Sequence, residues 1–325
     1  MGQLVDGKWT ANRIPRGGKG AFQRAEAGIR DWVTADGSSG FKAEAGRYHL
    51  YLSHACPWAH RTLIFRKLKK LEDVISISVV DWDMSDDGWH FSERDGAIPD
   101  PVFDAKFLRD VYVRSHSDFT GRVSVPVLLD KKEKRIVNNE SAEIIRMLNG
   151  AFDGFGDASV DFYPEDLRGE IDAINPRIYD TLNNGVYKCG FAGTQEAYED
   201  AFDALFATLD FLESRLSGRR YLAGGRITEA DWRLFTTLIR FDAVYFGHFK
   251  CNLRRIEDYP SLSNYLRELY QVPGVAGTVN MFHIKWHYHR SHTSINPLGI
   301  VPKGPDLDYT RPHDRERVRP LARAG

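Results

Sequence analysis

The pattern of hydrophobic and polar positions predicts an α/β segment in the first half of the chain. Residues 48–52 alternate as in a strand, residues 58–71 place apolar side chains on one helical face, and residues 75–80 read as a second strand. This order predicts a β-α-β unit, because parallel strands need a crossover connection between them. Cys56 then lies where the first strand passes into the helix.

Regular structure is expected again after a long polar stretch. Residues 81–121 show no regular pattern and are expected to form an insertion, and long insertions in compact domains are commonly functional. Beyond it, residues 123–129 and 135–138 flank a charged turn and predict a hairpin, and a helix is expected from Ser141. The first half therefore combines a β-α-β unit with a β-β-α unit.

The second half carries a helical pattern. Apolar side chains recur at alternating steps of four and three, at Tyr198, Phe202, Leu205, Leu209, Leu212 and Leu216. A further helix is predicted from Thr228, which can cap its N-terminus. Asp231 at the third helical position can accept the Thr228 backbone N–H, as in a capping box. These patterns predict an all-helical domain.

Changes in composition suggest the domain boundaries. We expect an N-terminal arm, an α/β domain that contains the insertion, a Gly- and Asp-rich linker, an all-helical domain and a tail rich in Pro, Gly and Arg. Their predicted ranges are 1–43, 44–150, 151–164, 165–295 and 296–325. Two domains are the natural expectation for a chain of 325 residues.

The charge balance excludes some classes of partner. With 44 Lys and Arg against 45 Asp and Glu, the formal net charge of −1 gives no general attraction to nucleic acid or to anionic membranes. The first ten residues lack the apolar core of a signal peptide, and no segment reaches the roughly 20 apolar residues of a membrane helix. We therefore expect a cytoplasmic protein that acts on a small, locally recognised substrate.

Three cysteines in so long a chain do not make a disulfide framework, so each is considered singly. Cys56 stands just ahead of a predicted helix, where unpaired backbone N–H groups and the helix dipole favour the thiolate. Cys189 and Cys251 are expected to be buried structural residues. Because Ala59 stands where a Cys-x-x-Cys motif has its second cysteine, Cys56 is predicted to be a nucleophile that needs an external thiol.

Two further pairs of residues suggest a binding site for a peptide-like ligand. Val125-Pro126 is unusual in a strand: a cis peptide would turn the Val125 backbone outward to pair with an extended peptide, whereas a trans proline on an edge strand is the ordinary alternative. Glu140 and Ser141 begin a predicted helix, where they can hold the two charged groups of an α-amino acid end or simply cap the helix. The residue pattern leaves both pairs of alternatives open.

A metal site is not expected. Several histidines gather near the end of the predicted helical domain, but no acidic or cysteine ligand accompanies them and only the first two share an i, i+4 face. They are His283, His287, His289 and His292. Ordinary packing and hydrogen bonding are their expected roles.

Together these features resemble a known family. The β-α-β-β-β-α order, with Cys-Pro at the first helix, Val-Pro before the hairpin and Glu-Ser at the third helix, resembles the thioredoxin-fold domain of glutathione transferases. The helical half, with Thr228 and Asp231, resembles their C-terminal domain. More closely, several segments resemble the Xi class, the glutathionyl-hydroquinone reductases: 51–68, 121–127, 139–146, 183–192 and 287–300. The resemblance covers nearly the whole chain, and it implies a glutathione-transferase architecture and a homodimer.

The resemblance also implies glutathione as a co-substrate and assigns residues to it. The residues that would line the glutathione site are Trp89, Arg122, Val123, Ser124 and Val125, with Glu140 and Ser141 at the γ-glutamyl end. Tyr187 is assigned proton transfer, and Tyr245 and Tyr288 are assigned stabilisation of the thiolate and stacking on the substrate. Among the 14 tyrosines, only the resemblance singles out these three.

The implied reaction is the reduction of S-glutathionyl-hydroquinones to hydroquinones with release of glutathione disulfide, through a mixed disulfide of Cys56 and glutathione. Two other enzymes would use the same nucleophile: an omega-like thiol transferase or dehydroascorbate reductase, and a reductive dehalogenase of halogenated hydroquinones. A non-catalytic glutathione-binding scaffold is the alternative from another functional class.

Overall fold

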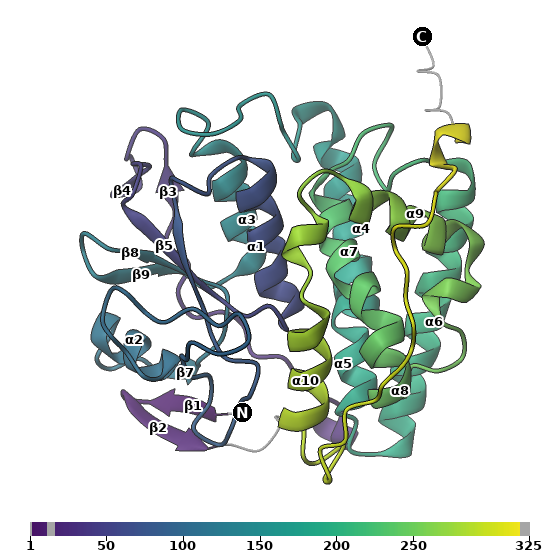
Figure 1. The fold of residues 1–325 in the computed structure, drawn as a ribbon, viewed down its shortest axis with the longest axis horizontal. Coiled ribbons are helices and arrows are strands. Elements are labelled where there is room, and N and C mark those ends of the chain that lie inside the picture. Colours follow the sequence, from purple (N-terminus) through teal and green to yellow (C-terminus); the bar gives the residue numbers. More distant parts are fainter. Residues whose placement is uncertain (1, 12–16, 319–325) are drawn as a thin grey trace. The chain divides into compact units, whose positions relative to one another are not determined.

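The computed structural model describes residues 2–11 and 17–318, which form two compact units (Figure 1). Unit 1 contains the described residues of the ranges 1–14, 25–161 and 277–301, and unit 2 those of 15–24, 162–276 and 302–325. Residues 277–301, most of which the sequence analysis assigns to the helical domain, therefore group with the α/β part of the chain.

Unit 1 is built on a four-stranded sheet with the order β6-β5-β8-β9. Its strands are β5 (Tyr48–Leu52), β6 (Ser76–Val79), β8 (Val127–Asp130) and β9 (Arg135–Asn138). Strands β5 and β6 run parallel, and β8 pairs antiparallel with both β5 and β9. Helices α1 (Pro57–Leu68) and α3 (Ser141–Gly150) pack against each other beside this sheet (Figure 1). The predicted order of β-α-β and β-β-α is confirmed.

The central strands are buried on both faces of the sheet. Every residue of β5 and of β8 is buried, so the alternation within 48–52 does not mark a solvent-exposed face. The strand predicted over 123–129 begins only at Val127. Its expected start was wrong because Pro126 offers no N–H group to the ladder.

The insertion contains more regular structure than the sequence predicts. Helix α2 (Leu108–Ser115) lies within 81–121, and it buries Leu108, Val111 and Tyr112. The prediction of an irregular insertion was wrong because a helix of two turns places too few apolar residues on one face to establish a period. The insertion ends in β7 (Gly121–Arg122).

The N-terminal arm also forms short strands. Strand β1 (Gly2–Val5) pairs with β2 (Lys8–Ala11) and with β7, and β3 (Val33–Thr34) pairs with β4 (Phe41–Lys42). The arm is therefore joined to the end of the insertion through β1 and β7. Helix α10 (Met281–Ser291) completes the regular elements of unit 1.

Unit 2 is built from helices, as predicted. They are α4 (Arg168–Ile178), α5 (Gly185–Gly190), α6 (Gln195–Gly218), α7 (Glu229–Arg240), α8 (Phe246–His248) and α9 (Pro260–Gln271), with π-helical turns at Tyr179–Asn183 and Phe241–Tyr245. The predicted capping box opens α7: the Thr228 N–H donates to Asp231 Oδ2 at 2.8 Å. Almost every residue of α7 is buried, which makes it the central helix of the unit.

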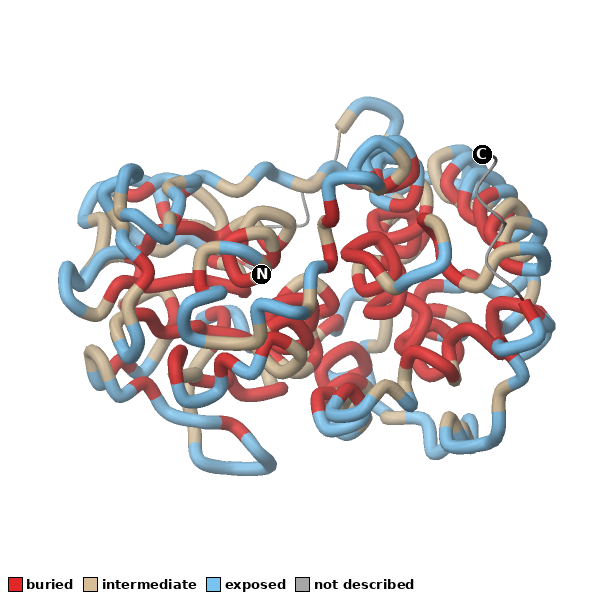
Figure 2. Tube along the Cα trace, turned by 90° about the horizontal axis from the view of Figure 1, so that it is seen from above, coloured by how far each residue is buried: buried red, intermediate tan, exposed pale blue. Residues whose placement is uncertain are grey.

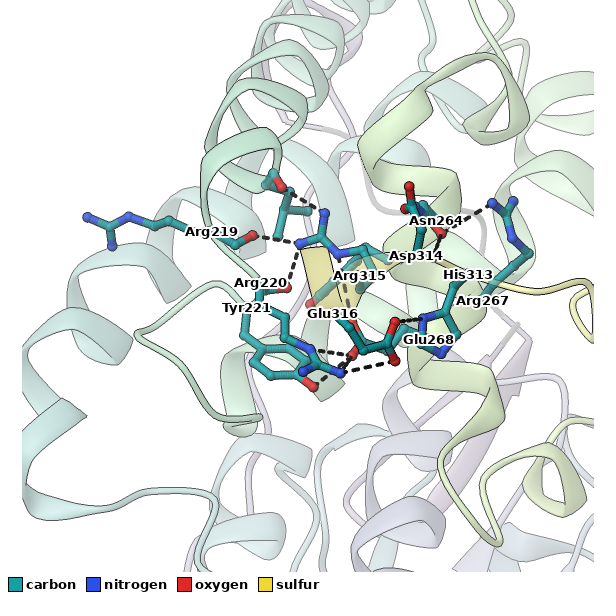
Figure 3. Close-up of polar contacts among 12 residues, drawn as sticks. Arg219, Arg220, Tyr221, Asn264, Arg267, Glu268, His313, Asp314, Arg315 and Glu316 are labelled. Carbon is teal, nitrogen blue, oxygen red and sulfur yellow. Dashed lines mark hydrogen bonds and ion pairs between the residues drawn. The ribbon is translucent and has the colours of Figure 1, made fainter. Parts of the chain in front are cut away.

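Short 3-10 turns join some of these elements. They lie at Gly18–Gly20, Glu165–Leu167, Ile256–Asp258, Ala276–Thr278 and Arg315–Arg317. The last of them belongs to the tail of unit 2, which Arg315 anchors at the end of the long helix α6 (Figure 3).

The Arg315 side chain is fully buried, and its guanidinium donates to the carbonyls of Leu216, Arg219 and Arg220 at 2.7, 2.6 and 2.6 Å. Glu268 of α9 lies 3.7 Å from Arg315 Nε, and it also accepts a hydrogen bond from Arg220 (Figure 3). Carbonyl groups at a helix end lack partners within the helix. Arg315 therefore caps the C-terminus of α6.

Buried residues gather inside each unit, and exposed residues follow the outer turns (Figure 2). In unit 1 one apolar cluster extends from the sheet into the insertion and includes Trp89, Val123 and Val125. None of the helices in the described part of the chain is long and apolar enough to cross a membrane.

Candidate active site

Cys56 is the N-cap residue of α1, which confirms its predicted place at a helix start. Its backbone is extended, with φ −77° and ψ 122°, its carbonyl accepts the His60 N–H at 3.0 Å, and Pro57 occupies the first helical position. The residue is half-buried, and its Sγ lies 3.6 Å from the carbonyl oxygen of Val125. The sulfur thus lies at a helix N-terminus, where the positive end of the helix dipole favours a thiolate.

Val125 faces this sulfur and precedes a cis peptide bond. Because the Val125-Pro126 bond is cis, the alternative of a trans proline is excluded. Val123 and Val125 belong to the same apolar cluster as Trp89, and Cys56 packs against that cluster. The structure therefore brings together the predicted nucleophile and part of the predicted glutathione site.

The start of α3 is tied to α1. Glu140 is the N-cap residue of α3 and its carboxylate accepts the Ala142 N–H at 3.0 Å, so capping, one of the two predicted alternatives, is observed. The Ser141 hydroxyl accepts a hydrogen bond from Arg61 of α1 at 3.3 Å. Arg61 is buried, and its guanidinium lies 4.6 Å from the centroid of the Trp58 ring. Helix α1 thus carries both the nucleophile and a contact to the predicted γ-glutamyl end.

Sequence reasoning assigned no role to Arg61, although it lies in the same short segment as Cys56. A signal was present, because an arginine on the buried side of a predicted helix needs a polar partner. Its identity as a partner of Ser141 comes from tertiary packing between α1 and α3.

Trp89 and Arg122 are held by elements from distant parts of the sequence. The Trp89 ring stacks on His287 of α10, with centroids 4.7 Å apart and an interplanar angle of 24°. His287 Nδ1 lies 2.9 Å from the carbonyl of Trp82, so this nitrogen carries the proton. Arg122 lies in β7 and pairs with Gln3 of β1. The arm, the insertion and α10 therefore support residues predicted to line the glutathione site.

The three predicted tyrosines belong to different units. Tyr187 and Tyr245 lie in unit 2 with ring centroids 6.0 Å apart, and Tyr245 is fully buried. The guanidinium of Arg24 lies 4.6 Å from the centroid of the Tyr187 ring, a contact that sequence reasoning missed. Tyr288 lies in unit 1, the unit of Cys56, where its ring packs edge-on against His292 at 5.3 Å.

The histidines of α10 contact the insertion. His283 Nε2 lies 2.7 Å from the carbonyl of Asp95, and burial lowers the pKa of His283 below its usual value, which favours the neutral ring. Within residues 2–11 and 17–318, no group of three or more His, Cys, Asp or Glu side chains is arranged to hold a metal ion. His283 and His287 each contact a backbone carbonyl of the insertion.

Known proteins resemble this chain over both units. Residues 55–151 match the family model described as glutathione S-transferase, N-terminal domain, and residues 195–268 match glutathione S-transferase, C-terminal domain. The glutathionyl-hydroquinone reductase PcpF of Sphingobium chlorophenolicum is 55% identical over 306 residues, which cover 94% of this chain and 96% of that protein.

Solved structures agree. The Xi class glutathione transferase from Natrialba magadii has a TM-score of 0.91 at 50% identity, with 98% of this chain and 97% of that chain covered. The glutathione-bound structure of YqjG, a glutathione transferase homolog from Escherichia coli K-12, has a TM-score of 0.90 at 51% identity, with 97% and 99% covered. By its residues, fold and relatives, the chain belongs to the Xi class of glutathione transferases, the glutathionyl-hydroquinone reductases.

Proposed function

We propose that this protein reduces S-glutathionyl-hydroquinones to hydroquinones, with Cys56 as the nucleophile and glutathione as the co-substrate. The observation that carries the proposal is the position of the Cys56 Sγ at the start of α1, 3.6 Å from the Val125 carbonyl that precedes the cis proline. The similarity to the glutathionyl-hydroquinone reductase PcpF supports the choice of substrate class.

In the first step, the Cys56 thiolate attacks the glutathione sulfur of the conjugate. A disulfide bond forms between the two sulfurs while the bond from sulfur to the aromatic carbon breaks. The electron pair of the broken bond stays on the ring carbon, which takes up a proton. The free hydroquinone then leaves. Tyr187 supplies or relays this proton, and Tyr245 and Tyr288 stabilise the thiolate or stack on the quinol ring.

In the second step, a free glutathione thiolate attacks the glutathione sulfur of the mixed disulfide. Glutathione disulfide forms, and Cys56 is released as a thiolate for the next cycle. A second cysteine in the protein is not required, because the free glutathione supplies the resolving thiol. In agreement with this, Ala59 occupies the position where a Cys-x-x-Cys motif has its second cysteine.

The glutathione itself binds along unit 1 in both steps. The backbone of Val125, with its neighbours Val123 and Ser124, pairs with the cysteinyl unit, while Trp89 and Arg122 line the site. Glu140 holds the γ-glutamyl ammonium, and Ser141 with the α3 N-terminus holds the carboxylate. This assignment is supported by the position of Glu140 and Ser141 at the start of α3 and by the contact between Cys56 and Val125.

Mass spectrometry of the protein mixed with a glutathionyl-hydroquinone tests the proposal. We expect one glutathione adduct, on Cys56, together with free hydroquinone, and loss of the adduct when glutathione is added. Cys189 and Cys251 are buried and serve as internal controls that stay unmodified. An unmodified Cys56 in the presence of released hydroquinone would overturn the mechanism.

The rival activities predict different products and preferences. A higher kcat/KM on a small mixed disulfide or on dehydroascorbate than on the glutathionyl-hydroquinone would favour the omega-like reductase. Release of chloride from a chlorinated hydroquinone would favour the dehalogenase. A scaffold without catalysis predicts that Cys56 reacts with iodoacetamide only near the pH of an ordinary cysteine, about 8.5.

We also propose a cytoplasmic homodimer in which the predicted linker 151–164 joins the two domains. The three free cysteines are consistent with a reducing compartment, which the consumption of glutathione also requires. Size-exclusion chromatography with light scattering tests the oligomeric state, and limited proteolysis tests the predicted linker at 151–164.

A further inference from the structure

One phenol in the insertion lies between two segments assigned to glutathione binding. Tyr112 of α2 is fully buried, and its hydroxyl donates to the carbonyl of Ser124 at 2.9 Å. The same oxygen accepts the Nδ2–H of Asn139 at 3.1 Å, and the Ser124 N–H approaches it at 3.4 Å. Ser124 directly precedes Val125, and Asn139 directly precedes Glu140.

This hydroxyl uses its whole hydrogen-bonding capacity. A phenol has one O–H to donate and can accept at its oxygen. Ser124 takes the donated bond, and Asn139 and Ser124 supply the accepted ones. Burial raises the pKa of Tyr112 although the bonds from Asn139 and Ser124 act against it, so the group stays a neutral donor.

Asn139 extends the connection to the N-terminal arm. The side-chain Oδ1 of Asn139 accepts the Ile29 N–H at 3.1 Å, and the backbone N–H of Asn139 donates to the Ile29 carbonyl at 3.0 Å. The Asn139 side chain therefore cannot rotate toward another partner without breaking its contact with the arm. Tyr112 thus links Ser124 to a residue that is itself fixed in place.

We propose that Tyr112 is a positioning residue for glutathione: its hydroxyl fixes Ser124 relative to Asn139, so that Val125 and Glu140 are correctly spaced for the cysteinyl and γ-glutamyl units. This inference rests on the proposed function. A ligand that binds both segments benefits from their prior alignment, because it does not have to order them on binding. It also gives the insertion a function, because α2 carries this phenol.

The test is the variant Tyr112→Phe, which keeps the ring and removes the hydroxyl. Binding of S-methylglutathione, which cannot form a disulfide, is measured by calorimetry. We expect the Kd to rise about tenfold, because the Ser124 carbonyl and the Asn139 amide lose their common partner. In steady state, the KM for glutathione should rise while kcat at saturating glutathione changes less than about twofold, since binding rather than chemistry is affected.

Tyr48→Phe is the matched control. Tyr48 is a buried tyrosine of β5 in unit 1 whose hydroxyl donates to the carbonyl of Lys42 at 2.7 Å. Removal of this hydroxyl should lower the thermal stability about as much as Tyr112→Phe and leave the Kd of S-methylglutathione unchanged. A merely structural role of Tyr112 predicts equal behaviour of the two variants, and that result overturns the inference.

If Tyr112→Phe does not fold, Asn139→Asp tests the same oxygen from the other side. An aspartate keeps an acceptor for the Ile29 N–H, but it removes the Nδ2–H donor and competes with Ser124 for the phenol proton. A raised Kd supports the inference, and an unchanged Kd contradicts it. The proposed function is tested by a different result: it is contradicted if the unaltered protein does not bind S-methylglutathione.

Discussion

The imidazole of His287 lies nearly parallel to the indole of Trp89, with an interplanar angle of 24° and 4.7 Å between the ring centroids. The two residues come from α10 and from the insertion, and the bond from His287 Nδ1 to the Trp82 carbonyl fixes the orientation of the imidazole. An aromatic side chain predicted to line the glutathione site is thus held by a segment near the end of the sequence.

We expect His287→Ala to weaken glutathione binding by about five- to tenfold, because a stacked ring pair contributes about 1 kcal/mol beyond its buried area. His287→Phe is the control, since it keeps a ring against Trp89 and loses the hydrogen bond to the Trp82 carbonyl. Its Kd for S-methylglutathione should lie between those of the unaltered protein and His287→Ala. Equal Kd values for all three proteins would show that Trp89 does not depend on this contact.

Cys56→Ala should abolish the reduction of glutathionyl-hydroquinones, with a fall in kcat of about three orders of magnitude or more, as for other nucleophiles that form covalent intermediates. Release of hydroquinone is followed by chromatography. Cys189→Ala provides the comparison, because Cys189 is buried in unit 2 and is expected to be structural. The activity of Cys189→Ala per folded molecule should be unchanged. Retention of full activity by Cys56→Ala would contradict the mechanism.

Acid should destabilise unit 1 through His49. Its ring is buried in β5 between Ser76 Oγ at 2.8 Å and Ser78 Oγ at 2.9 Å, and burial lowers the pKa of His49 from 6.5 to about 4. Between these two pKa values the unfolded chain binds a proton that the folded chain does not. The free energy of unfolding should therefore fall as the pH drops through this window, by up to about 1.4 kcal/mol per pH unit from this group.

Urea unfolding at a series of pH values measures this effect. His49→Gln can bond to both serines but does not titrate, so its free energy of unfolding should decline less between pH 6.5 and about pH 4 than that of the unaltered protein. Above pH 6.5 His49 is neutral in both the folded and the unfolded chain. The difference in the free energy of unfolding between the two proteins should therefore become constant there. Parallel curves throughout the range would mean that His49 is not the titrating group.

Arg315→Ala should lower the free energy of unfolding of the helical unit by about 3 kcal/mol, because it leaves buried carbonyls at the end of α6 without their donor and removes one of the two arginines that lie beside Glu268. Arg317→Ala is the matched control: Arg317 lies two residues further, its side chain is more than half exposed, and it pairs with Asp314 on the surface. Its effect should stay within about 0.5 kcal/mol. Thermal unfolding followed by circular dichroism distinguishes the two variants.

Local signals in the sequence were enough to predict the sheet, α1, α3 and the α7 capping box. Each depends on residues close in sequence, such as Thr228 and Asp231 or Cys56 and Pro57. The cis bond before Pro126 was one of two stated alternatives, and local sequence could not choose between them because the choice depends on packing around Val125.

The supporting contacts of the site could not be predicted in the same way. Arg61 and Ser141, or Trp89 and His287, meet only after segments from distant parts of the chain have packed. The sequence around either residue of such a pair does not identify the residue that it contacts. Helix α2 was missed for a related reason, since its two turns are stabilised by burial of Leu108, Val111 and Tyr112 rather than by a long apolar period.

The cap that Arg315 places on α6 has a consequence for biosynthesis. The Leu216 carbonyl is made 99 residues before the guanidinium that caps it. During translation from the N-terminus, α6 can form early, but the carbonyls at its end bond to water until Arg315 has left the ribosome. The end of α6 is therefore capped only after Arg315 has been made, and a chain cut short before Arg315 should keep the helix but expose its end to fraying.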